Sequence, residues 1–571
     1  MDWIARTNEE LKKQFAGRYT VRREKEHLVL EGGSGDWQEI VEAGFAAARA
    51  AKGNIKGCLV NDVRFTGEQP KPMRLPNIED QALEGMKPDV LVIGGGVVGC
   101  AIARELTRWK LDVLLAEKEC DVALHTSARN DGMVHPGLDL RKSKLKYWYN
   151  KRGNEMYDRV CGELEVPFAR TGQLLCFPKG YTPLLYLFKL YWNNLEIPSV
   201  VLKKKALYEK IPDLDTKLGC ALLFPTAGSV CPYGLTIAFA ENAIENGAVV
   251  SLNTAVLGME LEDRMIKSVR TNRGTVYPKV VVNAAGVFSE DVAAMAGDRF
   301  FSIHPRRGTN SILDKKASHL SLFNLSPILI SHLVGSHTKG GGIIRTIHGN
   351  LLLGPDAVET PEKENFATLR DSIDNVLHKQ RQTIGELGHG QIITYFTGVR
   401  AATFEEDFVI RRGLYTENIV HAAGIQSPGL TAAPAIAEDI TRMVLDQVAA
   451  EKNESFNPHR KAIVNAAELP EEERSALIAE NPDYGVILCR CEQVSRGEIA
   501  AALKRPLPCD SVDGVKRRVR AGMGRCQGGF CGPQVAQVIA KELNIPLEQV
   551  RKSGAGSEVL LGATKGGDTH V

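Results

Sequence analysis

The sequence predicts an α/β protein with one large domain between two smaller units. Three observations support this prediction. A strand, a glycine-rich turn and a helix follow one another at residues 89–109, which is the order of a doubly wound α/β domain. Four clustered cysteines lie far downstream, at residues 489–531. The chain has 571 residues, and roughly two to four domains are expected for that length.

Composition and charge exclude several classes of protein. Lys and Arg number 71 and Asp and Glu 69, a net charge of +2, which gives no footprint for nucleic acid or for an anionic membrane. No apolar run is long enough to span a bilayer, and the N-terminal residues contain no export signal. We therefore expect a cytoplasmic protein, in which clustered thiols more often bind metal or act in redox chemistry than form disulfides.

The first 66 residues are predicted to form a small ββαβ module. Two short strands at 19–23 and 26–32 precede an amphipathic helix at 36–51, for which Asp36 is a candidate N-cap. A closing strand follows at 57–63. Residues 67–86, which include three prolines, are the expected linker to the large domain.

The large domain, predicted over residues 87–450, opens with a βαβ unit. A buried strand at 89–93 leads through Gly94, Gly96 and Gly99 into a helix at 97–109, and a second strand at 113–116 ends at Glu117. These glycines allow the tight turn, the approach of the backbone to a pyrophosphate, and close helix–strand packing. An acid 23 residues after Gly94 suits the ribose hydroxyls. The unit predicts a Rossmann-type dinucleotide site, for either FAD or NAD.

Three later segments, at 125–139 ("HTSARNDGMVHPGLD"), 279–289 ("KVVVNAAGVFS") and 419–440, resemble the D-amino-acid-oxidase-like flavoproteins. The resemblance implies FAD, and a substrate domain of α+β type interleaved with the FAD-binding domain. It also implies that a helix beginning near residues 429–431 directs its positive end toward the flavin N1/O2 edge. The residues placed at the cofactor by this resemblance are Thr126, Ser127, Arg129, Asn130, His135, Ala284, Ala285, Gly286, Gly424, Gln426, Gly429, Leu430 and Thr431.

Within these flavoproteins, two groups are the most similar. Segments 348–357 ("HGNLLLGPDA") and 396–410 ("FTGVRAATFEEDFVI") resemble both the glycerol-3-phosphate dehydrogenase group, notably its anaerobic large subunit, and the L-2-hydroxyglutarate oxidase group. Many members of the first group carry a lysine in the terminal turn, where this chain has Gln426 and Ser427. That difference favours a hydroxy acid as substrate.

Oxidation of a secondary alcohol requires a base, a hydride acceptor and a fixed charge for an anionic substrate. His135 is the candidate base, and Arg400 is the candidate anion clamp because its planar guanidinium suits a carboxylate or phosphate. His135 could instead be a turn histidine, and Arg400 could be ion-paired with "FEED" at 404–407. Further substrate-binding candidates are Arg306, Arg307, Arg345 and His348.

A second site is predicted at residues 485–571, after a polar linker at 451–484. Cys489 and Cys491 form a CxC pair, and after 34 intervening residues Cys526 and Cys531 follow as Cx4C. The CxC spacing argues against zinc, and glycine-rich cysteine loops suit an iron–sulfur cluster, although zinc and structural thiols remain alternatives.

Two segments around these cysteines, 489–499 and 514–535, resemble the bacterioferritin-associated-ferredoxin-type domain. This small helical domain binds a 2Fe-2S cluster and is also fused to anaerobic glycerol-3-phosphate dehydrogenases. Basic residues between the two cysteine pairs would partly balance an anionic cluster: Lys516, Arg517, Arg518 and Arg520.

These resemblances together imply an FAD-dependent dehydrogenase of a small anionic secondary alcohol. The flavin would take two electrons, and the cluster would pass them one at a time to a partner acceptor, either a second flavoprotein or a membrane-linked subunit. Because the fused module is larger than the terminal turn, glycerol 3-phosphate is favoured over a 2-hydroxy acid. The alternatives are an amino-acid or amine oxidase, an NAD-dependent dehydrogenase, and a non-catalytic electron-transfer subunit.

Overall fold

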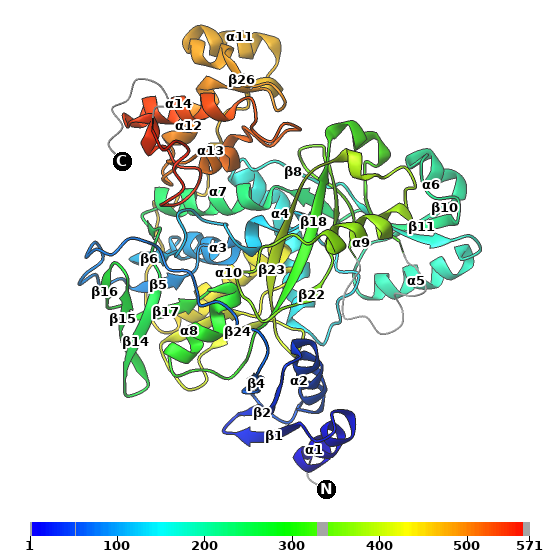
Figure 1. Cartoon of the computed structure of the whole chain (residues 1–571), viewed down its shortest axis with the longest axis vertical. Helices are drawn as coiled ribbons and strands as arrows, with labels where there is room; N and C mark the ends of the chain where they lie inside the picture. The colour runs from blue at the N-terminus through cyan, green and yellow to red at the C-terminus, as the bar shows by residue number, and fades with distance from the viewer. Residues whose placement is uncertain (1–2, 52, 328–340, 563–571) are drawn as a thin grey trace.

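The computed structural model describes residues 3–51, 53–327 and 341–562. It has an α/β core built on a six-stranded sheet (Figure 1). Five neighbouring strands are parallel, and the last is antiparallel. In spatial order they are β13 (Val249–Ser251), β6 (Val113–Ala116), β5 (Val90–Ile93), β17 (Val280–Asn283), β25 (Ile419–Ala423) and β24 (Val409–Arg412).

Both faces of this sheet are covered, as the continuous apolar runs of its strands require. Val90 and Val92 of β5 pack on one side with α3 (Val97–Leu106), α4 (Leu145–Glu163), α7 (Pro232–Glu245) and α10 (Gly429–Leu445). Leu91 and Ile93 pack on the other side with a small sheet and helix: β14 (Val256–Glu262), β15 (Met265–Thr271), β16 (Gly274–Val276) and α8 (Ser289–Met295). The α/β prediction is confirmed, although α3 ends three residues before the predicted residue 109.

A nine-stranded sheet, interleaved with the first along the chain, forms the second half of the large domain. Its order is β10 (Val200–Lys203), β11 (Leu218–Phe224), β9 (Gln173–Pro178), β19 (Asn324–Pro327), β20 (Gly342–Arg345), β21 (Leu351–Gly354), β18 (His304–Leu313) and β22 (Val358–Glu359), with β23 (Ile392–Ala402) also paired to β18. One face packs on α6 (Lys204–Lys210) and α9 (Arg370–Arg381), and α5 (Thr182–Asn194) covers part of the other. A three-stranded sheet of β7 (Met133–Val134), β12 (Gly228–Val230) and β8 (Phe168–Ala169) lies between them in sequence.

The N-terminal module has two elements that the sequence did not predict. Helix α1 (Trp3–Gln14) precedes the predicted strands and buries Leu11, and β4 (Arg64–Phe65) pairs with β2. The other elements are β1 (Tyr19–Glu24), β2 (His27–Ser34), α2 (Trp37–Ala51) and β3 (Leu59–Asn61). A carboxylate oxygen of Asp36 accepts the Gln38 N–H at 2.9 Å, as expected of an N-cap.

The C-terminal region is helical and lies at the opposite end of the long axis from the N-terminal module (Figure 1). It comprises α11 (Glu471–Glu480), the hairpin β26 (Ile487–Cys489) and β27 (Val494–Ser495), α12 (Arg496–Leu503), α13 (Val512–Val519) and α14 (Gly532–Leu543). Two of the predicted cluster cysteines, Cys489 and Cys531, belong to its buried core. Across the described ranges, no helix has the length and apolar character to cross a bilayer.

Candidate functional site

The glycine turn lies where the strand order of the parallel sheet reverses. Strand β5 has β6 on one side and β17 on the other, so the carboxyl ends of β5 and β17 border the crevice in which such sheets bind ligands. Gly94 has a φ of +110°, and a Cβ there would lie 2.5 Å from the Ala284 carbonyl oxygen. A Cβ on Gly99 would lie 1.9 Å from the Gly94 carbonyl oxygen. Only glycine allows these approaches, so the motif shapes the crevice.

Two predicted cofactor residues contact the backbone of this turn. The Gly95 N–H donates to Glu117 Oε2 at 2.6 Å, and the Val97 N–H donates to Ser127 Oγ at 2.9 Å. Burial raises the pKa of Glu117. Helix α3 has Gly96 as its N-cap residue, which offers no side-chain cap of its own. The turn therefore offers an anion a helix N-terminus and a backbone held in shape by a neighbouring segment.

Polar side chains of the segment at 124–132 donate hydrogen bonds to backbone carbonyls, most of them within the segment itself. Thr126 Oγ1 donates to the Val399 carbonyl at 2.6 Å. Asn130 Nδ2 donates to the Thr126 and Ser127 carbonyls at 3.1 and 2.9 Å, and Arg129 Nε donates to the Leu124 carbonyl at 3.1 Å. Their predicted contacts with a cofactor remain predictions, because these side chains already have backbone partners.

His135 follows β7 and lies beside the start of α10. Its N–H donates to Thr431 Oγ1 at 2.9 Å, and its Nε2 lies 3.3 Å from Ser427 Oγ. Leu430 contributes its carbonyl, which accepts the Tyr157 hydroxyl at 2.6 Å. The chain approaches through Gly424, at a φ of +63°. Helix α10 has no side-chain cap, and its first N–H, that of Gly429, donates to the Gln426 carbonyl at 2.6 Å. The positive end of the helix dipole still favours an anion beside this turn.

The end of β17 approaches the same crevice. The Ala284 N–H donates to the Ile93 carbonyl at 3.0 Å, which joins the ends of β17 and β5. Ala285 and Gly286 then turn away from the sheet, Gly286 with a φ of +57°. No heavy atom lies within 4 Å of the Cβ position of Gly286. This open backbone suits close approach of a flat ligand.

Strand pairing brings two arginines together. Arg306 of β18 lies directly opposite Arg400 of β23. Arg306 is buried and forms ion pairs with Glu359 at 2.5 Å and Glu406 at 2.7 Å, and its Nη1 lies 3.5 Å from Gln426 Oε1. The acidic "FEED" segment, predicted as a possible partner of Arg400, therefore pairs with Arg306 instead. Residues 426 and 427 join this arginine pair to His135.

Arg400 keeps donors that no carboxylate occupies. Its Nη2 donates to the Asp356 carbonyl at 3.0 Å, and within the described residues it forms no ion pair. A Cβ on Gly308 would lie 2.2 Å from Nη2, so the guanidinium lies against glycine backbone. Burial and the charge of Arg306 lower the pKa of Arg400. A bound anion would stabilise the half-buried positive charge of Arg400.

The other substrate-binding candidates lie elsewhere. Arg307 points to the opposite face of β18 from Arg306 and donates to the Ala367 carbonyl. Arg345 donates from Nη1 to the Ser318 carbonyl at 2.9 Å. It lies near the far end of β18, and the rise along that strand separates it from Arg400 by about 20 Å. His348 lies beyond it, where burial and then the charges of Arg520 and Lys315 lower its pKa to about 3. The structure does not bring these three residues to Arg400.

The four predicted cluster cysteines line one hollow of about 230 Å³, together with Arg490 and Phe530. Cys491 Sγ and Cys526 Sγ are 3.7 Å apart. Cys489 and Cys531 are buried, whereas Cys491 is exposed. This arrangement of two inner and two outer thiols fits a cluster bound at the surface.

The charges around this hollow favour the binding of positively charged metal ions between the four cysteines. Backbone N–H groups of Phe530 and Gly528 lower the pKa of Cys526. Burial and the neighbouring Cys489 raise the pKa of Cys531 to about 12. Four thiolates this close repel one another unless metal ions neutralise them. Cys509, outside both pairs, is buried in the domain core.

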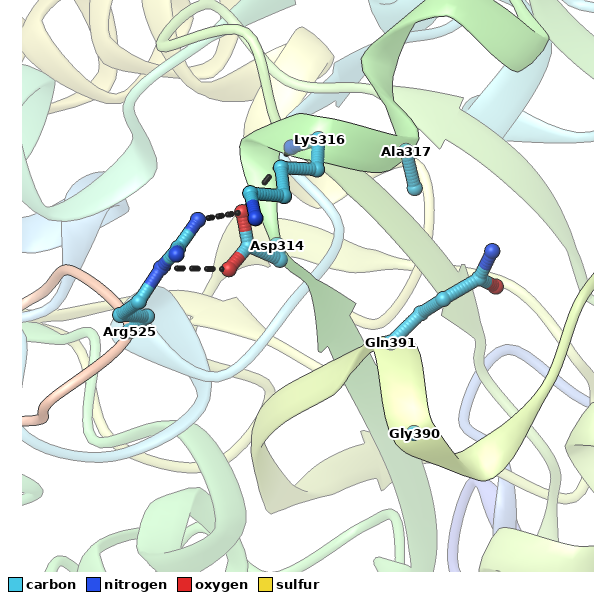
Figure 2. A pocket seen from close by; sticks show the side chains of 6 residues that line it. All are labelled: Asp314, Lys316, Ala317, Gly390, Gln391 and Arg525. Carbon is cyan, nitrogen blue, oxygen red and sulfur yellow. Dashed lines mark hydrogen bonds and ion pairs between the residues drawn. The ribbon is translucent and has the colours of Figure 1, made fainter.

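Ion pairs connect the cluster region to the large domain. Asp121, after β6, accepts from Arg517 Nη2 and Arg518 Nη1, both at 2.9 Å. Figure 2 shows Arg525, next to Cys526, paired with Asp314 at the end of β18, at 2.9 Å. The sequence suggests that Arg517 and Arg518 balance cluster charge, but their hydrogen bonds go to Asp121.

One further contact crosses this boundary close to both sites. The Tyr233 hydroxyl, in the first turn of α7, lies 3.1 Å from Met523 Sδ and 3.3 Å from Arg520 Nη1. Tyr233 follows β12, which pairs with β7 just before His135. A covalent and hydrogen-bonded path therefore runs from the flavin-type segment to the cysteine loop.

Comparison with known proteins agrees with this geometry. A family model described as FAD dependent oxidoreductase matches residues 89–443. The chain belongs to this family. A second model, described as a BFD-like 2Fe-2S binding domain, matches residues 487–541 of this FAD dependent oxidoreductase. The predictions of FAD and of a 2Fe-2S cluster are thereby confirmed, and NAD and zinc are not supported.

Relatives of this FAD dependent oxidoreductase include proteins named for glycerol 3-phosphate. It is 39% identical over 484 residues to a glycerol 3-phosphate dehydrogenase of Caloramator mitchellensis, covering 84% of this chain and 99% of the relative. It is 22% identical over 499 residues to a subunit of the anaerobic glycerol-3-phosphate dehydrogenase of Escherichia coli K12, covering 80% and 89%. Among solved structures, the dithionite-reduced L-alpha-glycerophosphate oxidase of Mycoplasma pneumoniae with FAD bound matches with a TM-score of 0.60 and 25% identity, over 66% of this chain and 98% of that one.

Proposed function

We propose that the protein oxidises glycerol 3-phosphate and passes the electrons through its 2Fe-2S cluster to a partner subunit. The observation that carries the substrate class is Arg400, which is half-buried and unpaired by any carboxylate of the described chain. It lies opposite Arg306, whose Nη1 is 3.5 Å from Gln426 Oε1, and the next residue, Ser427, has its Oγ 3.3 Å from His135 Nε2. A phosphate is a natural bidentate partner for such a guanidinium. The relative named glycerol 3-phosphate dehydrogenase, similar over nearly its full length, supports the same substrate.

Bound FAD supplies an acceptor for the two electrons and the hydrogen that leave the carbinol carbon. His135 accepts the hydroxyl proton, with its imidazole positioned by the Ser427 hydroxyl at 3.3 Å. Arg400 holds the phosphate and thereby orients the C–H bond. The N–H groups at the start of α10 favour negative charge in the crevice.

The cluster carries one electron at a time away from the large domain. Its four ligands are Cys489, Cys491, Cys526 and Cys531. The Phe530 side chain beside them is 84% exposed. An exposed aromatic residue next to an exposed ligand suits a docking partner, and we assign the electron acceptor to this face. The similarity to a protein named as one subunit of an anaerobic dehydrogenase supports an assembly of several chains.

A 2-hydroxy acid is the second candidate substrate. The terminal turn has Gln426, a neutral amide whose Nε2 donates to Glu406 at 2.6 Å, and therefore adds no positive charge for a phosphate. Arg400 alone would then bind a single carboxylate. The neutral terminal turn is therefore the observation that favours a 2-hydroxy acid, whereas the relative named for glycerol 3-phosphate favours that substrate.

Anaerobic reduction of the flavin distinguishes the candidates. Glycerol 3-phosphate, 2-hydroxyglutarate, glycerol and glycine would each be mixed with the holoenzyme, and bleaching of the flavin absorbance followed. We expect glycerol 3-phosphate to give the highest kcat/KM. Faster bleaching by 2-hydroxyglutarate would favour the second candidate, and faster bleaching by glycine would favour an amino-acid oxidase. Faster bleaching by the uncharged glycerol would contradict an anion site at Arg400.

A further inference from the structure

Asn310 is a buried polar residue of β18 that the proposed reaction does not use. It is 1% exposed, and neither its Nδ2 nor its Oδ1 has a hydrogen-bond partner within the described residues. Buried polar groups in proteins are nearly always hydrogen-bonded, because an unpaired amide loses its hydration without any compensation. A polar ligand in the crevice would supply the partners that the described chain does not.

Strand geometry places Asn310 beside the arginine pair. Successive side chains of a strand point to opposite faces, so Asn310 shares a face of β18 with Gly308 and Arg306. The Cβ position of Gly308 lies 2.2 Å from Arg400 Nη2, which means that the Arg400 guanidinium covers Gly308. Asn310 is the next residue on this face, about 7 Å further along the strand. One small molecule can therefore contact both Arg400 and Asn310.

The other neighbours of Asn310 connect it to the proposed base and leave it uncovered. Phe396, directly opposite Asn310 on β23, packs in one apolar cluster with Met133 of β7. Met133 precedes His135 by two residues, so the segment that carries the base passes this part of the sheet. Phe396 is only partly buried. A Cβ on Gly354 would lie 2.9 Å from Asn310 Oδ1, so glycine at this position keeps the oxygen accessible.

We propose that Asn310 binds the primary hydroxyl of glycerol 3-phosphate, an inference that rests on the function proposed above. Arg400 binds the phosphate and His135 accepts the proton of the secondary hydroxyl, which leaves the primary hydroxyl as the remaining polar group of the substrate. A hydroxyl can donate to Oδ1 and accept from Nδ2, as the unpaired amide requires. The second carboxylate of 2-hydroxyglutarate can only accept, so it would leave Oδ1 without a donor. Asn310 thus favours glycerol 3-phosphate over the hydroxy acid.

A substrate analogue tests this subsite. Propane-1,2-diol 1-phosphate keeps the phosphate and the secondary hydroxyl and lacks only the primary hydroxyl. In anaerobic flavin reduction by the FAD- and cluster-loaded enzyme, we expect kcat/KM to be at least about tenfold higher for glycerol 3-phosphate, because the analogue leaves the buried amide unpaired. Asn310→Leu replaces the amide by an apolar side chain of similar size. Its kcat/KM should fall about tenfold for glycerol 3-phosphate and should not fall for the analogue, so that the ratio approaches one. Asn310→Ala, which adds no bulk, should give the same ratio.

Ser311→Ala is the matched control. Ser311 is the next residue of β18, is also 1% exposed and has a buried hydroxyl without a partner in the described part of the chain, but it points to the opposite face. This variant should keep the ratio of the unchanged enzyme, and all the variants should keep their FAD content. Equal kcat/KM for the two phosphates in the unchanged enzyme, or an unchanged ratio in the Asn310 variants, would overturn the subsite alone. Failure of glycerol 3-phosphate to reduce the flavin would overturn the proposed function and the subsite with it.

Discussion

The contact between Asp121 and the arginines of α13 gives a prediction about electron transfer between the two sites. The Asp121 side chain is 4% exposed and that of Arg518 is 1% exposed. Both oxygens of Asp121 are used, since Oδ2 accepts from both arginines and Oδ1 lies 3.3 Å from Arg518 Nη2. Asp121→Asn removes the charge and leaves two guanidinium groups facing a neutral amide.

Breaking a buried pair from one side costs about 3–5 kcal/mol, because the remaining charge stays desolvated. This weakens the docked arrangement by about two to four powers of ten. Other contacts remain, including Arg505 with Glu241 at 2.6 Å and Arg525 with Asp314 at 2.9 Å, so the domain should loosen rather than separate. The cluster then spends less time at its transfer distance from the flavin.

Stopped-flow absorbance separates the two steps. In Asp121→Asn, reduction of the flavin by glycerol 3-phosphate should keep its rate, and the subsequent reduction of the cluster should slow at least tenfold. Hydrogen exchange in α13 should increase. Asp513→Asn is the control, because Asp513 pairs with Lys552 on the surface of the same domain, where a pair is worth at most about 1 kcal/mol. Unchanged cluster reduction and unchanged exchange in Asp121→Asn would refute the role of this pair.

The same pair predicts a pH dependence. Burial alone would raise the pKa of Asp121, but Arg518 and Arg517 lower it below its ordinary value. A carboxylate with a lowered folded pKa contributes stability that is complete above its unfolded pKa of about 3.9 and is lost as pH falls through the folded value. Docking should therefore hold at neutral pH and weaken only below about pH 4, as followed by hydrogen exchange in α13.

Three further substitutions test the two sites. Gly99→Ala should abolish FAD binding, because its Cβ would lie 1.9 Å from a carbonyl oxygen, whereas Gly162→Ala, with no atom within 4 Å, should retain FAD in a cofactor extraction assay. Arg400→Ala should lower kcat/KM for glycerol 3-phosphate by about 30- to 150-fold, the worth of a charge-assisted contact of about 2–3 kcal/mol, and an unchanged value would contradict its role. Cys526→Ser should abolish the rhombic EPR signal of the reduced cluster, and Cys509→Ser should leave it intact.

Much of this protein was accessible from local sequence. The βαβ unit is determined largely by neighbours a few residues apart, since Gly94 has a φ of +110° in the turn and Gly99 lies against the Gly94 carbonyl oxygen. The cluster site has the same character, because each cysteine pair lies in one short loop and both loops belong to one small domain. Local spacing is therefore enough to predict the two cofactors. Helix α1 was missed because its amphipathic pattern reveals an apolar face but not the core that covers it.

The tertiary structure alone decided which charges meet. Arg306 and Arg400 are neighbours because of strand register, and that register assigns Glu406 to Arg306 and leaves Arg400 without a carboxylate among the described residues. Asp121 and Arg518 are 397 residues apart, and no local pattern connects them. The exposed outer side of α5, where Leu187 is 62% exposed, has the same origin, because an apolar helix reads alike in sequence whether or not another layer covers it. Sequence determines what each segment can bury or bind, and packing determines which partners it meets.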